Sequence, residues 1–434
     1  MGDFGKLPLE LREAILADVT KVDLSALSCT SKWMRDAIEP NLYRDIEWDW
    51  GDSDLHHRPV HLLVRTLLIR PTLSTYVKSV DFAGGKPFRE FQSSFMNVRL
   101  GPTCSVWTVE DVPDFSKQEM RLAIRLIHSL RLSCVDLWLQ ELKRGEVDVF
   151  VALLLAQSYN LRRLRLDFEF QTTKFVGSLL GRAALRSGHC PFSALETVDY
   201  SGDINDKVSP FMDHTIDFTQ VLELFRLPSI QSMRMALPVY SIPWTEQNSP
   251  TTFTLTSLVL HHTQLSEIDL GHLLRASPNL KSLEFHLWYN LSSSYRQRGD
   301  RQIYLDCVDL STSLAFVRAS LQHLVVDIGF GYHGRVLAPS EGMNGRLDGL
   351  QHFVKLSSLE IPSIMLLGWD LDKWTPEIPR TLADVMPPNL SQLCFTDHLT
   401  HLEGNPWNDE HLLSLIEAYL EARHTSQPYM DKCR

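Results

Sequence analysis

The chain has 434 residues, of which 44% are hydrophobic and 22% are charged, and its formal net charge is −11 at pH 7. This composition is typical of a soluble globular protein with a large core rather than of a disordered chain. The acidic balance and the lack of a dense lysine or arginine run argue against nonspecific nucleic-acid binding, which needs a basic face. The longest wholly apolar stretch, residues 150–156, is far shorter than the roughly 20 residues that cross a bilayer, so we expect no membrane span.

The cysteines and the amino terminus indicate an intracellular compartment. The seven cysteines are odd in number and scattered, with no Cys-x-x-Cys pair, which argues against a disulfide framework and a thiolate metal site. The amino terminus has no basic segment followed by an apolar one, so no secretory signal is expected. The sequence therefore predicts a cytoplasmic or nuclear protein.

Three short helical segments are predicted between residues 7 and 48. The first carries apolar residues at helical spacing on one face: Leu11, Ile15, Leu16 and Val19. Asp23 is the expected N-cap of the second helix and Ser31 that of the third, which Pro40 is expected to end because proline has no backbone N–H. About forty residues are near the limit for an independent domain, so part of this apolar surface should face another protein or the rest of the chain.

The order and spacing of residues in this segment resemble an F-box. The matching residues are Leu7-Pro8, Glu10, Ile15-Leu16, Asp23-Leu24 with Leu27, Ser31-Lys32 and Asn41-Leu42-Tyr43-Arg44. The resemblance covers residues 6–48 and is similar to the version common in fungal F-box proteins. It implies a surface that binds a Skp-type adaptor, and the adaptor would link the chain to a cullin-based ubiquitin ligase. The residues implied at or near this surface are Leu7, Pro8, Leu11, Ile15, Leu16, Leu24 and Leu27. The alternative is that the same leucines form the core of an N-terminal helical cap.

A second pattern repeats along the chain: three apolar residues separated by two positions and then by one. It occurs at Val77-Val80-Phe82, Leu132-Val135-Leu137, Leu161-Leu164-Leu166, Leu195-Val198-Tyr200, Ile230-Met233-Met235, Leu255-Leu258-Leu260, Leu280-Leu283-Phe285, Leu321-Leu324-Val326, Leu356-Leu359-Ile361 and Leu390-Leu393-Phe395. This frame is the strand portion of a leucine-rich repeat. Because one unit is too small to bury its own apolar side, successive units are expected to stack into one core.

Helical segments are predicted between these frames. They are residues 59–70, 116–129, 150–157, 270–276, 311–319 and 381–386, and a last helix starting at Asp409 is expected to cap the array. Ser116 and Glu119 have the spacing of a capping box. The predicted fold is an α/β solenoid, with a three-helix F-box at residues 1–50, an irregular leucine-rich-repeat array with an inner curved parallel sheet and outer helices at 51–424, and a disordered tail at 425–434.

One departure leaves the repeat number and boundaries open. Where regular members continue after the strand to an Asn or Cys ladder, this chain has Gln140, Glu169, Asp203, Thr263 and Gly329.

Residues between the apolar positions are expected to face outward from the sheet. The central outward positions are Asp81, Asp136, Arg165, Asp199, Arg234, Val259, Glu284, Val325, Glu360 and Cys394, which makes this face net negative. Trp138, Asp167, His261, His286 and Asp327 are expected to flank it. The predicted substrate-binding residues are Trp138, Arg165, Asp167, Arg234, His261, Glu284 and His286. The expected partner is a protein with a basic or polar docking segment, and the alternative is an ordinary solvated sheet face.

Motifs that suggest catalysis fail on context. Residues 329–334 match Gly-x-Gly-x-x-Gly, but the glycines and proline that follow leave no helix to hold a pyrophosphate, so an inter-repeat loop is predicted. The adjacent histidines His261 and His262 point to opposite faces of a strand and are poorly placed to share a metal. We therefore expect no enzymatic activity, no cofactor and no metal. The sequence predicts a substrate-recognition subunit of a ubiquitin ligase; the alternatives are a repeat scaffold acting outside a ligase and an enzyme that uses the glycine-rich loop.

Overall fold

The computed structural model describes most of the chain in separate stretches. They are residues 4–48, 58–82, 115–132, 134–166, 174–184, 192–200, 219–237, 241–244, 252–290, 297–298, 301–302, 305–331, 343–368, 381–396 and 409–426. Two compact units divide it: the first unit is residues 1–205 with 215–230, and the second unit is residues 206–214 with 231–434. The predicted boundary near residue 50 lies outside the described residues and stays a prediction.

The central element is an all-parallel sheet of ten strands whose order follows the chain. In the first unit the strands are β1 (Asp45–Trp48), β2 (Ser79–Phe82), β3 (Arg163–Leu166) and β4 (Thr197–Asp199). In the second they are β5 (Ser232–Ala236), β6 (Ser257–Thr263), β7 (Ser282–Asn290), β11 (His323–Gly331), β13 (Ser358–Pro362) and β14 (Gln392–Thr396). Parallel neighbours need a crossover. Described helices lie in most of these connections, although none is described between β5 and β6. The result is a repeat-like parallel α/β architecture.

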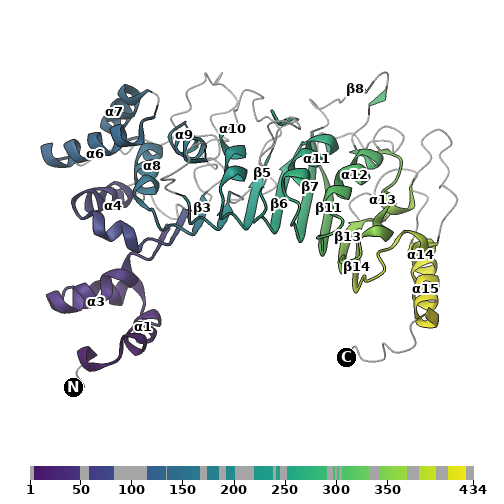
Figure 1. The fold of residues 1–434 in the computed structure, drawn as a ribbon, viewed down its shortest axis with the longest axis horizontal. Coiled ribbons are helices and arrows are strands. Elements are labelled where there is room, and N and C mark those ends of the chain that lie inside the picture. The colour runs from purple at the N-terminus through teal and green to yellow at the C-terminus, as the bar shows by residue number, and fades with distance from the viewer. Residues whose placement is uncertain are drawn as a thin grey trace. The chain divides into compact units, whose positions relative to one another are not determined.

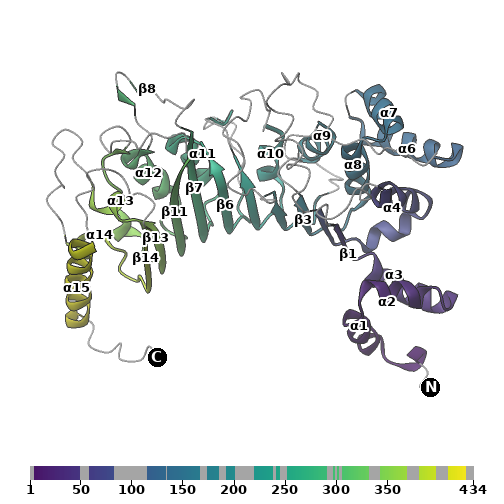
Figure 2. The same cartoon turned by 180° about the vertical axis from the view of Figure 1, so that it is seen from behind.

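The helices of the first unit are α1 (Leu9–Ala17), α2 (Lys21–Ser28), α3 (Lys32–Leu42), α4 (Arg58–Ile69), α6 (Lys117–Leu130), α7 (Val135–Arg144), α8 (Val147–Gln157), α9 (Lys174–Ala184) and α10 (Thr219–Leu222). Its 3₁₀ turns are η1 (Phe4–Lys6), η2 (Pro71–Tyr76) and η4 (Glu223–Arg226). Helices α1–α3 are grouped at the β1 end of this unit (Figure 2). The predicted capping box of α6 is confirmed, with the Ser116 backbone N–H 2.7 Å from a Glu119 carboxylate oxygen.

The helices of the second unit are α11 (Glu267–Ala276), α12 (Cys307–Leu314), α13 (Ser363–Leu367), α14 (Leu382–Val385) and α15 (Asp409–Ser426), with the 3₁₀ turns η5 (Ala315–Val317) and η7 (Leu350–His352). Helices α11, α12 and α13 lie on one side of its strands (Figure 1). Two small pairs complete it: antiparallel β8 (Gln297–Arg298) with β9 (Arg301–Gln302), and parallel β10 (Leu305–Asp306) with β12 (Met343–Asn344).

The apolar frames form the core of the sheet, as predicted. In β3 the exposed fractions of Leu164 and Leu166 are 1% and 0%, while Arg163 and Arg165, which alternate with them, are exposed. The first apolar residue of each frame is also buried, as Leu161 and Leu280 show at 0%. At β14 burial is weaker, because Leu393 and Phe395 are only half-buried. The period of two therefore predicts which residues face the core.

A side-chain ladder joins successive strands at their amino ends. The side-chain amide of Asn160 donates to the Thr75 carbonyl at 2.7 Å, and that of Asn279 donates to the Phe253 carbonyl at 2.8 Å. Three more donors follow the same rule: Asn389 to Val354, Ser229 to Ser193 and Ser320 to Pro278. Each donor immediately precedes a frame, and each acceptor lies two residues before the frame of the preceding strand. This polar ladder therefore lies just before the strands, whereas the leucine-rich-repeat pattern would place one after them.

Two predicted details of the N-terminal helices are wrong and one is confirmed. The N-cap of α2 is Thr20, whose hydroxyl accepts from the Asp23 backbone N–H at 3.2 Å, because the helix starts before Asp23. Pro40 lies inside α3 rather than at its end. Helical hydrogen bonding continues past Pro40, since the Tyr43 backbone N–H donates to the Glu39 carbonyl at 3.1 Å. Ser31 caps α3 as predicted and accepts from Met34 at 3.1 Å.

The frame Leu132-Val135-Leu137 does not form a strand, which corrects the predicted position of Trp138 and Asp136. Both residues lie in α7, where Trp138 is 2% exposed and packs edge-on against Phe175 with ring centroids 4.7 Å apart. The same sequence has apolar residues at helical spacing, and the helical period prevails. Trp138 is therefore a core residue of the first unit.

Two further corrections concern the sheet itself. Gly329 to Gly331 end strand β11 and pair with β7, so this part of the glycine-rich motif is strand rather than loop. The rest of the motif lies outside the described residues. Strand β1 was not predicted, although Tyr43, Ile46 and Trp48 fit the repeated frame.

Candidate functional site

The N-terminal helices have a very small core and a large exposed apolar surface. The core consists of Leu16, Leu24 and Ile38, which are 4%, 3% and 0% exposed. Around it, apolar side chains remain in solvent at high exposed fractions: Leu11 53%, Ile15 47%, Val22 78% and Trp33 45%. We call these four residues the apolar helical surface. These four side chains are not covered by the rest of the described chain.

The predicted adaptor-binding residues divide between these two environments. Leu11 and Ile15 belong to the apolar helical surface, and Pro8 is exposed as well. Leu16 and Leu24 are in the core, and the remaining two, Leu7 and Leu27, are half-buried. The residues of the predicted set thus serve both to hold the three helices together and to present an apolar surface.

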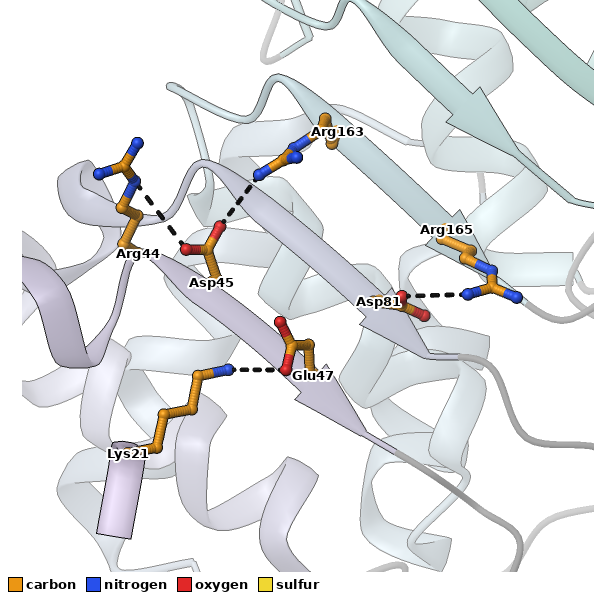
Figure 3. Close-up of polar contacts among 7 residues, drawn as sticks. All are labelled: Lys21, Arg44, Asp45, Glu47, Asp81, Arg163 and Arg165. Carbon is orange, nitrogen blue, oxygen red and sulfur yellow. Dashed lines mark hydrogen bonds and ion pairs between the residues drawn. The ribbon is translucent and has the colours of Figure 1, made fainter. Parts of the chain in front are cut away.

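An ion pair connects these helices to the rest of the first unit. Glu39 in α3 is 7% exposed, and each of its carboxylate oxygens accepts a hydrogen bond from Arg70 at 2.7 Å. These bonds raise the pKa of the Arg70 guanidinium. A second pair joins α2 to β1, with the Lys21 ammonium 3.2 Å from the Glu47 carboxylate (Figure 3). The helices are therefore held against the first strand by charged contacts.

The open face of the first unit's sheet is strongly ionic. Glu47, Asp81, Arg165 and Asp199 lie in one register across β1–β4. Arg165 is 3.4 Å from Asp81 and 3.8 Å from Asp199, and Arg163 is 3.4 Å from Asp45 (Figure 3). The predicted outward position of Arg165 is confirmed. Asp136 was expected between Asp81 and Arg165, but these two residues are direct neighbours, and Glu47 extends the row on the other side of Asp81.

The remaining residues predicted to face outward lie in one register across the second unit's sheet: Arg234, Val259, Glu284, Val325, Glu360 and Cys394. The outward prediction is wrong for Val259, which is only 4% exposed. His286 lies beside this row. Its ring is 4.8 Å from that of His261, and its two nitrogens are 3.2 Å from Asp327 and 3.8 Å from Glu284. Burial disfavours the imidazolium, but the two carboxylates outweigh it and raise the pKa of His286 to about 9. The neighbouring His286 imidazolium in turn lowers the pKa of Glu284.

The comparisons with known proteins identify no family. No protein-family model matches the chain, and no curated protein is found similar to it.

The predicted substrate-binding residues are only partly brought together. Arg234, His261, Glu284 and His286 share the second unit's face, whereas Arg165 belongs to the first unit's face. Trp138 is buried in α7, and Asp167 lies outside the described residues. The sequence did not single out the exposed cations Arg162 and Arg163, because the repeated frame marks as outward only its central position and the position two residues later. The doublet preceding Leu164 was the available signal.

Two kinds of site are not observed where the structure describes the chain. Across these residues, no group of three or more His, Cys, Asp or Glu side chains is arranged to hold a metal ion. None of the described helices combines the length and the apolar character that crossing a bilayer requires. The features with functional character are the apolar helical surface and the two ionic sheet faces.

Proposed function

We propose that this chain is a substrate-recognition subunit of a Skp-cullin-F-box ubiquitin ligase. The N-terminal helices bind a Skp-type adaptor, and the strand faces bind the target protein. The reaction itself takes place on other chains, and this subunit raises the effective concentration of target near them. The observation that carries the proposal is the apolar helical surface, together with the ordered F-box-like residues on the same helices.

Burial of the apolar helical surface would contribute favourably to such an interface. Fully burying one leucine or isoleucine side chain contributes about 1.5–3 kcal/mol, and tryptophan adds a large contact area. Leu11 and Ile15 are each about half exposed, at 53% and 47%, so roughly half of that contribution is still available from each. Trp33 and Val22 add exposed apolar area that an adaptor could also cover.

Target binding is assigned to the second unit's face, where Glu284 and Asp327 are the acidic groups beside His286. Val325 flanks Glu284 in the same register and is partly exposed, so it can supply apolar contact, whereas Val259 on the other side of Glu284 is only 4% exposed. Such a surface suits a target segment with basic or polar side chains. Because the adaptor surface is on α1, α2 and α3, the two binding events use separate residues.

The test is adaptor capture by the full chain and by two double variants. Leu11→Asp with Ile15→Asp places charges on the apolar helical surface without entering the core, and binding of a Skp-type adaptor should fall at least tenfold. The matched control is Val354→Asp with Leu413→Asp, where the side chains are 55% and 58% exposed in the second unit and the net charge change is the same. The control should bind normally. Lack of adaptor binding by the unaltered chain contradicts the proposal, and adaptor capture without cullin favours a scaffold outside a ligase.

A further inference from the structure

Three exposed arginines lie at or just before strand β3. Arg162 precedes the strand, Arg163 begins it and Arg165 follows two residues later. Their side chains are 58%, 64% and 50% exposed. Arg44 and Lys78, which immediately precede β1 and β2, are also exposed. These five residues form what we call the basic row.

The acidic partners of these arginines are less exposed to solvent than the arginines are. Glu196, paired with Arg162, is 37% exposed, and Asp45, paired with Arg163, is 32% exposed. Asp199, which is 3.8 Å from Arg165, is only 24% exposed. The short carboxylates therefore support the longer guanidinium groups around β3, and the cationic groups are outermost there. On β1 the side chain of Glu47 is itself 65% exposed and is paired with Lys21.

The existing ion pairs leave donor capacity for a ligand. The pairs of Arg162, Arg163 and Arg165 have N–O separations between 3.3 and 3.8 Å. Strong charge-assisted hydrogen bonds are shorter, about 2.7–2.9 Å. Each guanidinium has five N–H donors, so outward-facing donors remain after the internal pair has formed.

The basic row is also regularly spaced. The Lys78 backbone N–H donates to the Arg44 carbonyl at 2.8 Å, and the Arg162 N–H donates to the Lys78 carbonyl at 2.8 Å, so these three residues share one register. Neighbouring strands are about 4.8 Å apart, and alternate side chains of an extended segment are about 6.8 Å apart on one side. Long arginine and lysine side chains bridge that difference. Two or more acidic residues of one extended segment can thus each reach a cation.

We propose that the basic row of β1–β3 binds an extended acidic segment of a partner protein. Complementary charge favours carboxylate side chains at these outward guanidinium groups. This surface differs from the one assigned to target binding and does not depend on the adaptor, so failure of the proposed function leaves this inference standing.

The experiment measures binding of a fluorescent ten-residue peptide of alternating glutamate and serine to the full-length protein. A peptide of alternating lysine and serine and a single-stranded DNA of the same charge as the acidic peptide serve as comparison probes. The acidic peptide should bind, more weakly as salt rises, and the lysine peptide should not. Tighter binding of the DNA than of the acidic peptide overturns the assignment to a protein segment.

Variants locate the site. Arg162→Gln with Arg163→Gln should weaken peptide binding about tenfold, as expected for the loss of two exposed ion pairs. The matched control, Arg318→Gln with Lys355→Gln, removes two exposed cations of the second unit and should leave binding unchanged. Equal loss in both variants means that net charge alone governs binding and refutes the proposal. Lys78 makes no ion pair with any residue in the described stretches, so Lys78→Glu changes the charge of the basic row without breaking an ion pair. Peptide binding by this variant should fall, and unchanged binding also refutes the proposal.

Discussion

Glu146 is a buried carboxyl group whose protonation should control the stability of the first unit. It immediately precedes α8, its exposed fraction is 6%, and one of its carboxylate oxygens has no hydrogen-bond partner among the described residues. Burial, with smaller contributions from the charges of Asp148 and Glu141, raises its pKa from 4.5 to about 7. Between about pH 4.5 and pH 7, the folded protein therefore keeps a proton on Glu146 that the unfolded chain releases.

The direction and size of the effect follow from these two values. Because the folded pKa lies above the unfolded one, the stability contribution of Glu146 is greatest below about pH 4.5 and is lost as pH rises towards 8. A shift of about 2.5 pKa units corresponds to a destabilisation of about 3 kcal/mol at pH 8, against about 1 kcal/mol at pH 5. Replacing the carboxyl group by an amide removes this pH-dependent penalty.

The assay is urea unfolding of the unaltered protein and of Glu146→Gln at pH 5 and pH 8. The gain in unfolding free energy of the variant should be about 2 kcal/mol larger at pH 8 than at pH 5. This difference is the decisive quantity, since any packing or hydrogen-bond change caused by the amide is common to both pH values. Glu410→Gln, at an exposed site of α15, is the control and should show no such difference. A gain that is the same at both pH values refutes the reasoning.

Three other predictions concern the first and second units. Glu39→Gln should lower the unfolding free energy measured in urea by about 1–2 kcal/mol, because it removes one charge of the pair with Arg70. The side chain of Arg70 is 44% exposed, which limits the cost, and an unchanged unfolding free energy shows that the pair is not stabilising. Leu16→Ala should cost about 2–4 kcal/mol in the same assay, whereas Leu11→Ala should cost less than about 0.5 kcal/mol, and equal costs contradict the division between core and surface. The unaltered protein should lose stability as pH rises from about 6.5 through about 9, since the folded pKa of His286 is raised and its charged form is stabilising only below that value. Thermal unfolding across this range should show the loss, and His286→Asn should reduce it; an identical pH profile in the variant argues against a stabilising imidazolium.

The sequence predicts the sheet well because burial in a strand alternates. Leu164 and Leu166 could be identified as core, and Arg165 as outward, from the period alone. The period fails where the same apolar residues also fit a helix, as at Val135, Trp138 and Leu142 in α7. Short apolar runs are ambiguous in this way, and only packing decides between the two.

Contacts across the strands lay beyond prediction for a different reason. Arg163 meets Asp45, which lies 118 residues earlier in the chain, and this meeting depends on the register of two strand pairs. The outward position of each residue could be expected, but its partner could not. The pairing of Glu39 with Arg70 was likewise missed, since it requires the packing of α3 against the turn that follows α4.

The amide ladder at the amino ends of the strands has a consequence for how such a chain can diversify. The rungs at Asn160, Asn279 and Asn389 join residues separated by 85, 26 and 35 positions, yet they have nearly the same length. Alignment of one strand with the next is therefore independent of how much polypeptide lies between them. New material can be spliced into a crossover while neighbouring strands stay in step, so connecting segments are free to acquire functions without cost to the sheet.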